Sequence, residues 1–238
     1  MLKENDILLP GLAKQFQFLK KRFPFKGDEK VLVIGFGCEK IAAEIANAYG
    51  VPVDVIVDDY NLFINARLNL KDADNVKVKT MDFESSDYDD ETFDLIYAQA
   101  SVTVPNRNKI VKEIKRILKP DGRLLVGEFV LLKDEPPAFI SDIFESSDME
   151  PLLDGALIDY YQKRNFETVD EIDLSNTLKD YYGAQKQRLK ENIDALTESE
   201  KSYYKTVLKK ISHESNVYLK LGGDKFYGFK ALLLKKKN

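Results

Sequence analysis

The chain has 238 residues, of which 44% are hydrophobic and 32% charged, and its formal net charge is −4. These proportions are ordinary for a globular protein with a substantial core, so we expect one α/β domain over residues 1–238. The negative charge argues against a general nucleic-acid-binding protein. The single cysteine, Cys38, excludes an internal disulfide, and the single histidine, His213, argues against a His/Cys metal site. We therefore predict no metal centre.

No apolar run approaches the roughly 18 residues that a membrane span requires. The first ten residues also lack the charged region and apolar core of a signal peptide. We therefore expect a cytoplasmic protein that has no membrane partner.

An N-terminal cap over residues 1–27 contains the first helical pattern. Residues 8–25 place four apolar side chains at helical spacing, and Pro24 ends the pattern. These side chains are Leu12, Phe16, Leu19 and Phe23. We expect this helix to cover the core; the alternative is that it helps to close a ligand pocket.

The stretch KVLVIGFGCEK, residues 30–40, organises the rest of the chain. Four apolar residues at 31–34 run into Gly35-Phe36-Gly37, and a helical pattern follows over 41–49. An apolar run without polar alternation suits a strand that is covered on both faces, as in a parallel α/β sheet. The two glycines allow the backbone to turn tightly and to approach a ligand near helix N–H groups. A nucleotide-like cofactor is therefore predicted at this turn.

A second apolar strand, residues 53–57, ends in Asp58-Asp59. In nucleotide-binding α/β folds, a carboxylate at this place, about 20 residues beyond the glycines, holds ribose hydroxyls. A charged carboxylate accepts two hydrogen bonds from a diol. We favour Asp58 over Asp59 because it directly follows the apolar run; an ordinary turn at the strand end is the alternative.

The later pattern continues the alternation of strands and helices. Further strands are predicted at 76–79, 93–98, 123–129, 166–174 and 226–234, and helices at 61–70 and 110–118, where Pro120-Asp121-Gly122 stops the helix. The alternation predicts a parallel sheet with helices on both faces.

Two helical segments, 133–165 and 176–222, interrupt the regular alternation. Within the second, Thr197-x-x-Glu200 is a capping box that starts a helix over 198–220. The segments carry three tyrosine pairs that either form a lid over a ligand or pack the helices. These pairs are Tyr160-Tyr161, Tyr181-Tyr182 and Tyr203-Tyr204.

Five motifs together carry a family resemblance. They are VLVIGFG at 31–37, VIVDD at 55–59, MDF at 81–83, ETFDLIYA at 91–98 and EIKRILKPDGRLLVGE at 113–128. In this order and spacing the chain resembles class I methyltransferases that use S-adenosylmethionine, especially the small-molecule branch with ubiquinone/menaquinone-biosynthesis and N-methyltransferase-like enzymes. The resemblance covers residues 28–132 well and the remainder in layout only. It implies a Rossmann-like sheet of seven mostly parallel strands whose last strand is antiparallel.

The resemblance also implies roles for nine residues in holding S-adenosylmethionine. The methionine moiety and ribose edge would lie along the glycine turn, the ribose diol at the tip of the second strand, adenine beside the third, and the methionine amino group and sulfonium beside the fourth. The residues at the glycine turn are Gly35, Phe36 and Gly37, and the acid for the ribose diol is Asp58, with Asp59 as the alternative. Adenine would meet Asp82 and the backbone N–H of Phe83. The methionine amino group and sulfonium would lie beside Ala98 and Gln99.

The sequence departs from the family pattern at two positions. Val33 stands where the family usually has an acidic residue, and Glu39 replaces its third glycine. The first change removes a polar anchor near the methionine amino end. Glu39 either interferes with close approach of the cofactor or supplies a carboxylate from another direction.

The predicted reaction is methyl transfer to a small-molecule acceptor by direct in-line displacement. If the acceptor must lose a proton, Glu128 after the fifth strand is the first candidate for the base, and His213 is the second. Segments 133–165 and 176–222 would cover the acceptor. The acceptor atom and the oligomeric state do not follow from the sequence.

Three other functions fit parts of the pattern. A non-catalytic S-adenosylmethionine-binding module is suggested by the departures at Val33 and Glu39. An NAD-dependent oxidoreductase would also use Gly35, Gly37 and Asp58, but its third glycine would fall on Lys40. Aminopropyl transfer on the same fold is a minor alternative.

Overall fold

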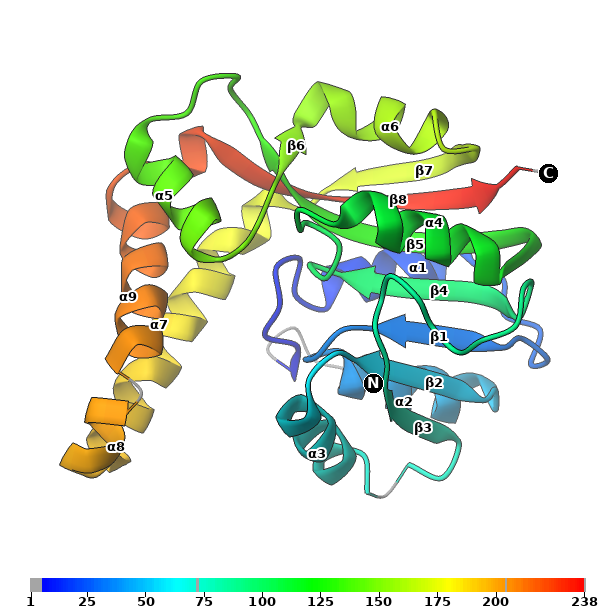
Figure 1. The fold of residues 1–238 in the computed structure, drawn as a ribbon, viewed down its shortest axis with the longest axis horizontal. Coiled ribbons are helices and arrows are strands. Elements are labelled where there is room, and N and C mark those ends of the chain that lie inside the picture. Colours follow the sequence, from blue (N-terminus) through cyan, green and yellow to red (C-terminus); the bar gives the residue numbers. More distant parts are fainter. Residues whose placement is uncertain (1–5, 72, 204, 238) are drawn as a thin grey trace.

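The computed structural model describes residues 6–71, 73–203 and 205–237 and contains one central sheet. Its main strand order is β3-β2-β1-β4-β5-β8-β7 (Figure 1). The strands are β1 Val31–Ile34, β2 Val53–Val57, β3 Val76–Thr80, β4 Phe93–Gln99, β5 Leu118–Leu131, β7 Phe166–Asp173 and β8 Tyr227–Lys236. The predicted Rossmann-like sheet is confirmed, and a two-residue strand that the sequence did not predict, β6 Leu152–Leu153, pairs with β5.

Helices cover both faces of this sheet, as the alternation of strands and helices predicts (Figure 1). They are α1 Lys14–Arg22, α2 Glu39–Tyr49, α3 Tyr60–Asn69, α4 Arg107–Ile117, α5 Ala138–Ser146, α6 Asp154–Gln162, α7 Leu178–Ala195, α8 Glu198–Tyr203 and α9 Lys205–Lys220. Val31 and Val33 of β1 belong to a core cluster with α1 and α2, whereas Leu32 and Ile34 belong to another with α4 and α6. Both faces of β1 are therefore buried, which explains why its sequence shows no alternation of polar and apolar residues.

The direction of the strands determines where a ligand can lie. Strands β3, β2, β1, β4 and β5 are parallel neighbours, whereas β8 runs antiparallel to both β5 and β7. The antiparallel last strand is thus confirmed. Because parallel strands end at the same edge, the carboxyl ends of β1 to β4 lie side by side, and ligands of open α/β sheets bind at that edge.

The N-terminal helix is shorter than the predicted range of residues 8–25. It begins at Lys14, because Gly11 and Leu12 have φ values of 86° and 48°, which a right-handed helix does not allow. Leu12 is buried, although it lies outside the helix.

The turn after α4 also differs from the prediction. The helix ends at Ile117 and β5 starts at Leu118, so Pro120 comes too late to stop the helix. Asp121 takes a φ of 62° and pairs with Lys235 at 2.6 Å.

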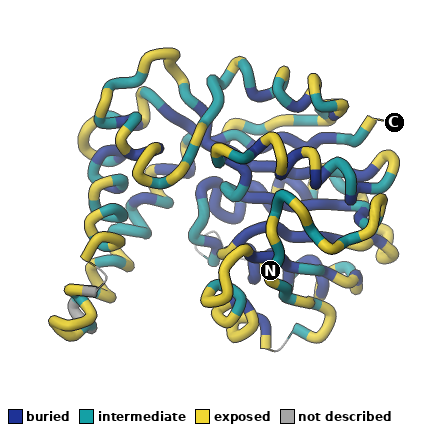
Figure 2. The backbone as a smooth tube through the Cα atoms, viewed as in Figure 1, coloured by how far each residue is buried: buried dark blue, intermediate teal, exposed yellow. Residues whose placement is uncertain are grey.

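The predicted cover segments separate into two parts. In segment 133–165, α5 contacts α9, but α6 packs on the sheet through Leu157 and Tyr161. Helices α7, α8 and α9 form an arm that stands on the side toward which β1 and β4 point (Figure 1), and its far end is largely exposed (Figure 2). The capping box at Thr197 is confirmed: Glu200 N–H donates to Thr197 Oγ1 at 3.3 Å and Thr197 N–H to Glu200 Oε2 at 2.8 Å. It starts α8, and α9 follows as a separate helix.

Residues 6–71, 73–203 and 205–237 contain neither a candidate membrane-spanning helix nor a candidate metal-binding group. No helix there is long and apolar enough to cross a bilayer. No group of three or more His, Cys, Asp or Glu side chains lies close enough to hold a metal ion. The cytoplasmic location stays a prediction.

Candidate functional site

The glycine turn at the end of β1 is fixed by its own backbone and by a neighbouring loop. Gly35 and Gly37 have φ values of 101° and 90°, a region that favours glycine. A Cβ at Gly35 would lie 2.8 Å from Ser101 Cβ, and the Ser101 hydroxyl donates to the Ile34 carbonyl at 3.0 Å. Phe36, at the tip, is 41% exposed. Gly35 is thus required by conformation and by the close approach of Ser101.

The acid that replaces the third glycine turns back on the same loop. Glu39 is buried, and its Oε1 accepts a hydrogen bond from the Gly37 N–H at 3.0 Å. Its carboxylate therefore supports the turn. Beside it, burial and then the charge of Glu39 raise the pKa of the Cys38 thiol, which argues against Cys38 as a nucleophile.

The two acids after β2 have different surroundings. Asp59 caps α3, since its Oδ1 accepts from the N–H groups of Asn61 and Leu62 at 2.8 and 3.0 Å. Asp58 is exposed, and among the described residues its carboxylate has no hydrogen-bond or ion-pair partner. This difference favours Asp58 as the acid available to a ligand.

The residues after β3 lie next to the end of β2. The Met81 N–H donates to the Val57 carbonyl at 3.0 Å and so holds the two strand ends together. Asp82 is exposed and accepts from the Glu84 N–H at 2.8 Å, while Phe83 is partly buried against the α4 face of the sheet. Asp82 therefore lies at the same edge as Asp58.

The tip of β4 is in contact with the N-terminal segment. Gln99 Nε2 donates to the carbonyls of Pro10 and Leu12 at 2.7 and 2.9 Å. The Ala98 carbonyl accepts from Gln15 Nε2 at 3.0 Å. The contacts predicted for Ala98 and Gln99 with a methionine group would have to coexist with these bonds, and they stay predictions.

Residues 9–12 connect three parts of the molecule. A Cβ at Gly37 would lie 3.1 Å from Leu9, and the Gly11 N–H donates to Thr177 Oγ1 at 3.1 Å, directly before α7. The connecting role of this segment was not predicted from the sequence. Its one local signal was Gln15, a polar residue three positions after Leu12 on the predicted apolar face.

Glu128, the predicted base, lies in a buried polar cluster beneath α4 and α6. Its Oε2 accepts from Arg107 Nε at 2.8 Å and from the Thr103 hydroxyl at 3.4 Å, and its Oε1 accepts from the Tyr161 hydroxyl. Arg107 also donates to the Glu150 carbonyl. Burial and then Glu128 raise the pKa of Tyr161 well above its ordinary value. A substrate proton would compete with these donors, so the contacts fit a structural role better than a catalytic one.

The remaining candidates are not gathered at the sheet edge. His213 is exposed on α9. Tyr161 and Tyr182 are buried in packing contacts, in keeping with the packing alternative, whereas Tyr160 is partly exposed. Tyr204 lies outside the described residues.

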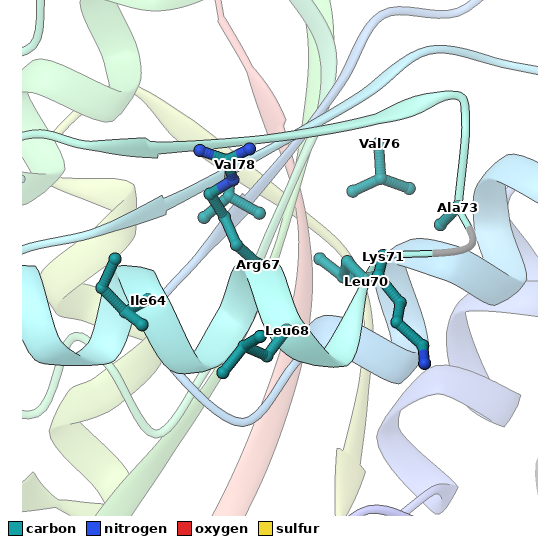
Figure 3. A pocket seen from close by; sticks show the side chains of 8 residues that line it. All are labelled: Ile64, Arg67, Leu68, Leu70, Lys71, Ala73, Val76 and Val78. Atoms are coloured by element: carbon teal, nitrogen blue, oxygen red, sulfur yellow. The ribbon is translucent and has the colours of Figure 1, made fainter.

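A groove of about 530 Å³ lies between α3 and β3 (Figure 3). Arg67 extends from α3 toward Val78 of β3, whereas Lys71 points away from the strand (Figure 3). The lining contains neither the glycine turn nor the acids after β2. This groove is therefore separate from the candidate site.

Comparison with known proteins identifies the central part of the chain. The family model described as "Methyltransferase domain" matches residues 32–126, from β1 into β5. Residues 32–126 are therefore similar to a methyltransferase domain. This range spans the glycine turn, Asp58, Asp82 and the tip of β4. Two solved structures of similar fold hold S-adenosylhomocysteine and S-adenosyl-L-methionine, the cofactor class that the sequence predicts.

One curated relative and two solved structures extend this result. A ubiquinone/menaquinone biosynthesis C-methyltransferase from Idiomarina loihiensis is 32% identical over 136 residues, which are 52% of this chain and 53% of that protein. The Haemonchus contortus phosphoethanolamine N-methyltransferase 2, solved with phosphomonomethylethanolamine and S-adenosylhomocysteine, has a TM-score of 0.80 at 15% identity. That match covers 98% of this chain and 55% of the other. The [4+2]-cyclase SpnF has a TM-score of 0.75 at 20% identity, covering 94% and 80%.

Coverage and sequence identity determine how much these matches say about the chain. The chain spans about half the length of the first two of these relatives. At 15 and 20% identity, the two structures show that this chain shares their fold. The acceptor does not follow from that likeness, since fold alone does not determine the reaction.

Proposed function

We propose that this protein transfers a methyl group from S-adenosylmethionine to a small-molecule acceptor by direct in-line displacement. The observation that carries the proposal is Asp58, an exposed carboxylate without a described protein partner at the end of β2, beside the glycine turn of the region that is similar to a methyltransferase domain. An ionised carboxylate can accept both hydrogen bonds that a ribose diol donates.

The residues at the carboxyl edge fit the cofactor in kind. Asp58 would hold the ribose diol, and Asp82 would face the adenine amine. The open backbone of Gly35 and Gly37 would admit the methionine end, whereas Val33, which is fully buried in the apolar core, offers no polar anchor there. When bound, the cofactor supplies a methyl group that is already activated by its sulfonium.

The remaining work of the protein is positioning. In well-oriented systems, holding two reactants in line contributes about 7–11 kcal/mol to lowering the barrier, so a general base is not obligatory. Ser101 and Glu39 support the glycine turn, and Asp59 fixes the start of α3. In this proposal the side chains of the edge orient the donor, and no covalent enzyme intermediate forms.

The acceptor would lie between the carboxyl edge and the helices α5, α7 and α9 of one methyltransferase unit over 1–238. The support for this position is that the arm stands on the side toward which β1 and β4 point (Figure 1). The acidic charge of the chain and the size of the helical segments favour a small molecule over a nucleic acid.

Titration of S-adenosylhomocysteine into three proteins tests the donor site: the wild type, Asp58→Asn and Asp59→Asn. Both variants keep side-chain size, and asparagine also caps helices well. We expect Asp58→Asn to weaken binding about tenfold or more, because a charge-assisted hydrogen-bond pair is lost. Asp59→Asn should bind within about twofold of the wild type. Unaltered affinity in Asp58→Asn would refute the assignment of the ribose site.

A non-catalytic or differently acting binding module is the second candidate. Two observations favour it: Glu128 already accepts hydrogen bonds on both oxygens, and a [4+2]-cyclase shares the fold. Incubation of the wild type with S-adenosylmethionine and a panel of amine, phenol, thiol and carbon acceptors separates the two candidates. Formation of S-adenosylhomocysteine supports transfer, whereas donor binding without any product supports the module.

A further inference from the structure

A small basic pocket lies between α4 and the turn that follows α6, on the face of the sheet opposite α1 and α2. Its volume is about 250 Å³. The lining consists of four cationic side chains, two amides and one valine: Lys112, Lys115, Lys163, Arg164, Asn108, Asn165 and Val111. No carboxylate lines it, and it shares no residue with the candidate cofactor site.

The lysines of this pocket differ from Lys109 of α4 and Lys119 of β5. Lys109 pairs with Glu84 at 2.8 Å, and Lys119 pairs with Asp94 at 2.7 Å. In contrast, no carboxylate of the described residues lies within 4.0 Å of the amines of Lys112, Lys115 and Lys163. Like charges that face one hollow repel each other, so the pocket attracts an anion.

Arg164 is held in place by contacts of its own. Its guanidinium lies 3.5 Å from the centroid of the Tyr160 ring and donates to the Tyr160 carbonyl at 2.8 Å and to Asn108 Oδ1 at 2.5 Å. The Tyr160 hydroxyl donates to the same Asn108 oxygen at 2.7 Å. These bonds use two of the five N–H donors of Arg164, which leaves the others available in a fixed orientation.

We propose that this pocket binds the phosphoryl group of a small anionic ligand. A fixed guanidinium beside three unpaired ammonium groups is the donor set that recognises phosphate oxygens. The volume lies below the roughly 300–1,000 Å³ of pockets for drug-sized ligands, which favours a phosphate or diphosphate group over a larger molecule. The inference does not depend on methyl transfer.

Calorimetric titration of the full chain with pyrophosphate and with inorganic phosphate, at low ionic strength, tests the site. The triple variant Lys112→Gln, Lys115→Gln, Lys163→Gln removes its unpaired lysines. The matched triple variant Lys205→Gln, Lys209→Gln, Lys225→Gln removes the same charge from exposed positions elsewhere. We expect the first to bind pyrophosphate about tenfold or more weakly and the second to stay within about twofold of the wild type.

Three outcomes would overturn the proposal: no measurable binding by the wild type, equal affinity in the first variant, or an equal loss in both variants. Loss of pyrophosphate binding in the presence of saturating S-adenosylhomocysteine would also overturn it, by locating the anion in the cofactor site. Arg164→Lys keeps the charge but loses the planar fork, so it should bind more weakly than the wild type.

The source of the phosphoryl group is tested separately by sedimentation with vesicles of phosphatidylcholine that contain phosphatidic acid. Binding of free pyrophosphate without vesicle binding supports a small soluble ligand. Vesicle binding without measurable affinity for free pyrophosphate would refute the small-ligand proposal and indicate a lipid surface.

Discussion

The edge of β1 to β3 and the buried cluster beneath α4 and α6 use carboxylates in opposite ways. At the edge, Asp58 is exposed and has no partner among the described residues. In the cluster, Glu128 is fully buried and accepts from Arg107, Thr103 and Tyr161. A carboxylate that already has its donors contributes to the fold, whereas one without them is available to a ligand.

The largest effect is expected when the buried Glu128 loses its partner Arg107. Arg107→Met leaves Glu128 as a buried charge without its main partner, and removing one member of such a pair typically costs about 3–5 kcal/mol of unfolding free energy. Urea denaturation measures the loss. The double variant Arg107→Met, Glu128→Gln should recover part of it, because no charge then remains buried. A loss below about 1 kcal/mol in the single variant would contradict the structural role of the cluster.

At the edge, the largest expected effect comes from the glycine turn. Gly35→Ala combines a φ of 101° with a Cβ placed 2.8 Å from Ser101, so we expect a loss of about 1–3 kcal/mol in stability together with weaker donor binding. Gly183→Ala is the matched control, because Gly183 lies inside α7 and an added Cβ would meet no atom within 4 Å. That variant should gain up to about 1 kcal/mol by helix propensity. Thermal denaturation of both variants shows whether the two signs differ.

The two acids after β2, Asp58 and Asp59, should respond differently to substitution by alanine. Asp59→Ala removes the cap of α3 and should lower stability by about 1 kcal/mol. Asp58→Ala should leave stability nearly unchanged and lower donor affinity. Chemical denaturation without ligand, followed by titration of S-adenosylhomocysteine, measures both quantities. Equal changes in stability and in donor affinity for Asp58→Ala and Asp59→Ala would refute the different roles of the two acids.

A smaller effect is expected in acid from the α4 side of the molecule. Burial raises the pKa of Glu113, but hydrogen bonds from Arg116 and Ser86 outweigh it and lower the pKa overall. Because the folded-state pKa is depressed, this stabilisation is complete above the unfolded value of about 4.3 and is lost as the pH falls through the folded value. Glu113→Gln should therefore lose less stability than the wild type between neutral pH and about pH 3. The exposed Asp87→Asn serves as control and should follow the wild type.

The smallest change concerns the thiol behind the glycine turn. Because burial and the neighbouring Glu39 raise its pKa, Cys38 should not react with iodoacetamide at pH 8 in the native protein. Mass spectrometry before and after unfolding in urea measures the labelled fraction. Fast labelling of Cys38 in the folded chain would mean that the glycine turn opens and exposes the thiol.

The sequence predicted the parts of the fold that depend on neighbouring residues. The predicted strands at 31–34 and 53–57 coincide with β1 and β2, since an unbroken apolar run is a local signal. The partners of Glu128 were not predicted, because Arg107 and Tyr161 are 21 and 33 residues away in the chain. The start of the first helix was also missed, since Gly11 and Leu12 take their conformations where Gln99, far along the chain, binds the carbonyls of Pro10 and Leu12.

The short segment 9–12 has a consequence for the mobility of the arm. Leu9 rests on the glycine turn, Gln99 binds the carbonyls on either side of Gly11, and Gly11 itself is tied to Thr177 where α7 begins. A movement of α7 would displace Gly11, while Leu9 at the other end of the segment contacts the glycine turn. A displacement of α7 would therefore reach the glycine turn through residues 9–12.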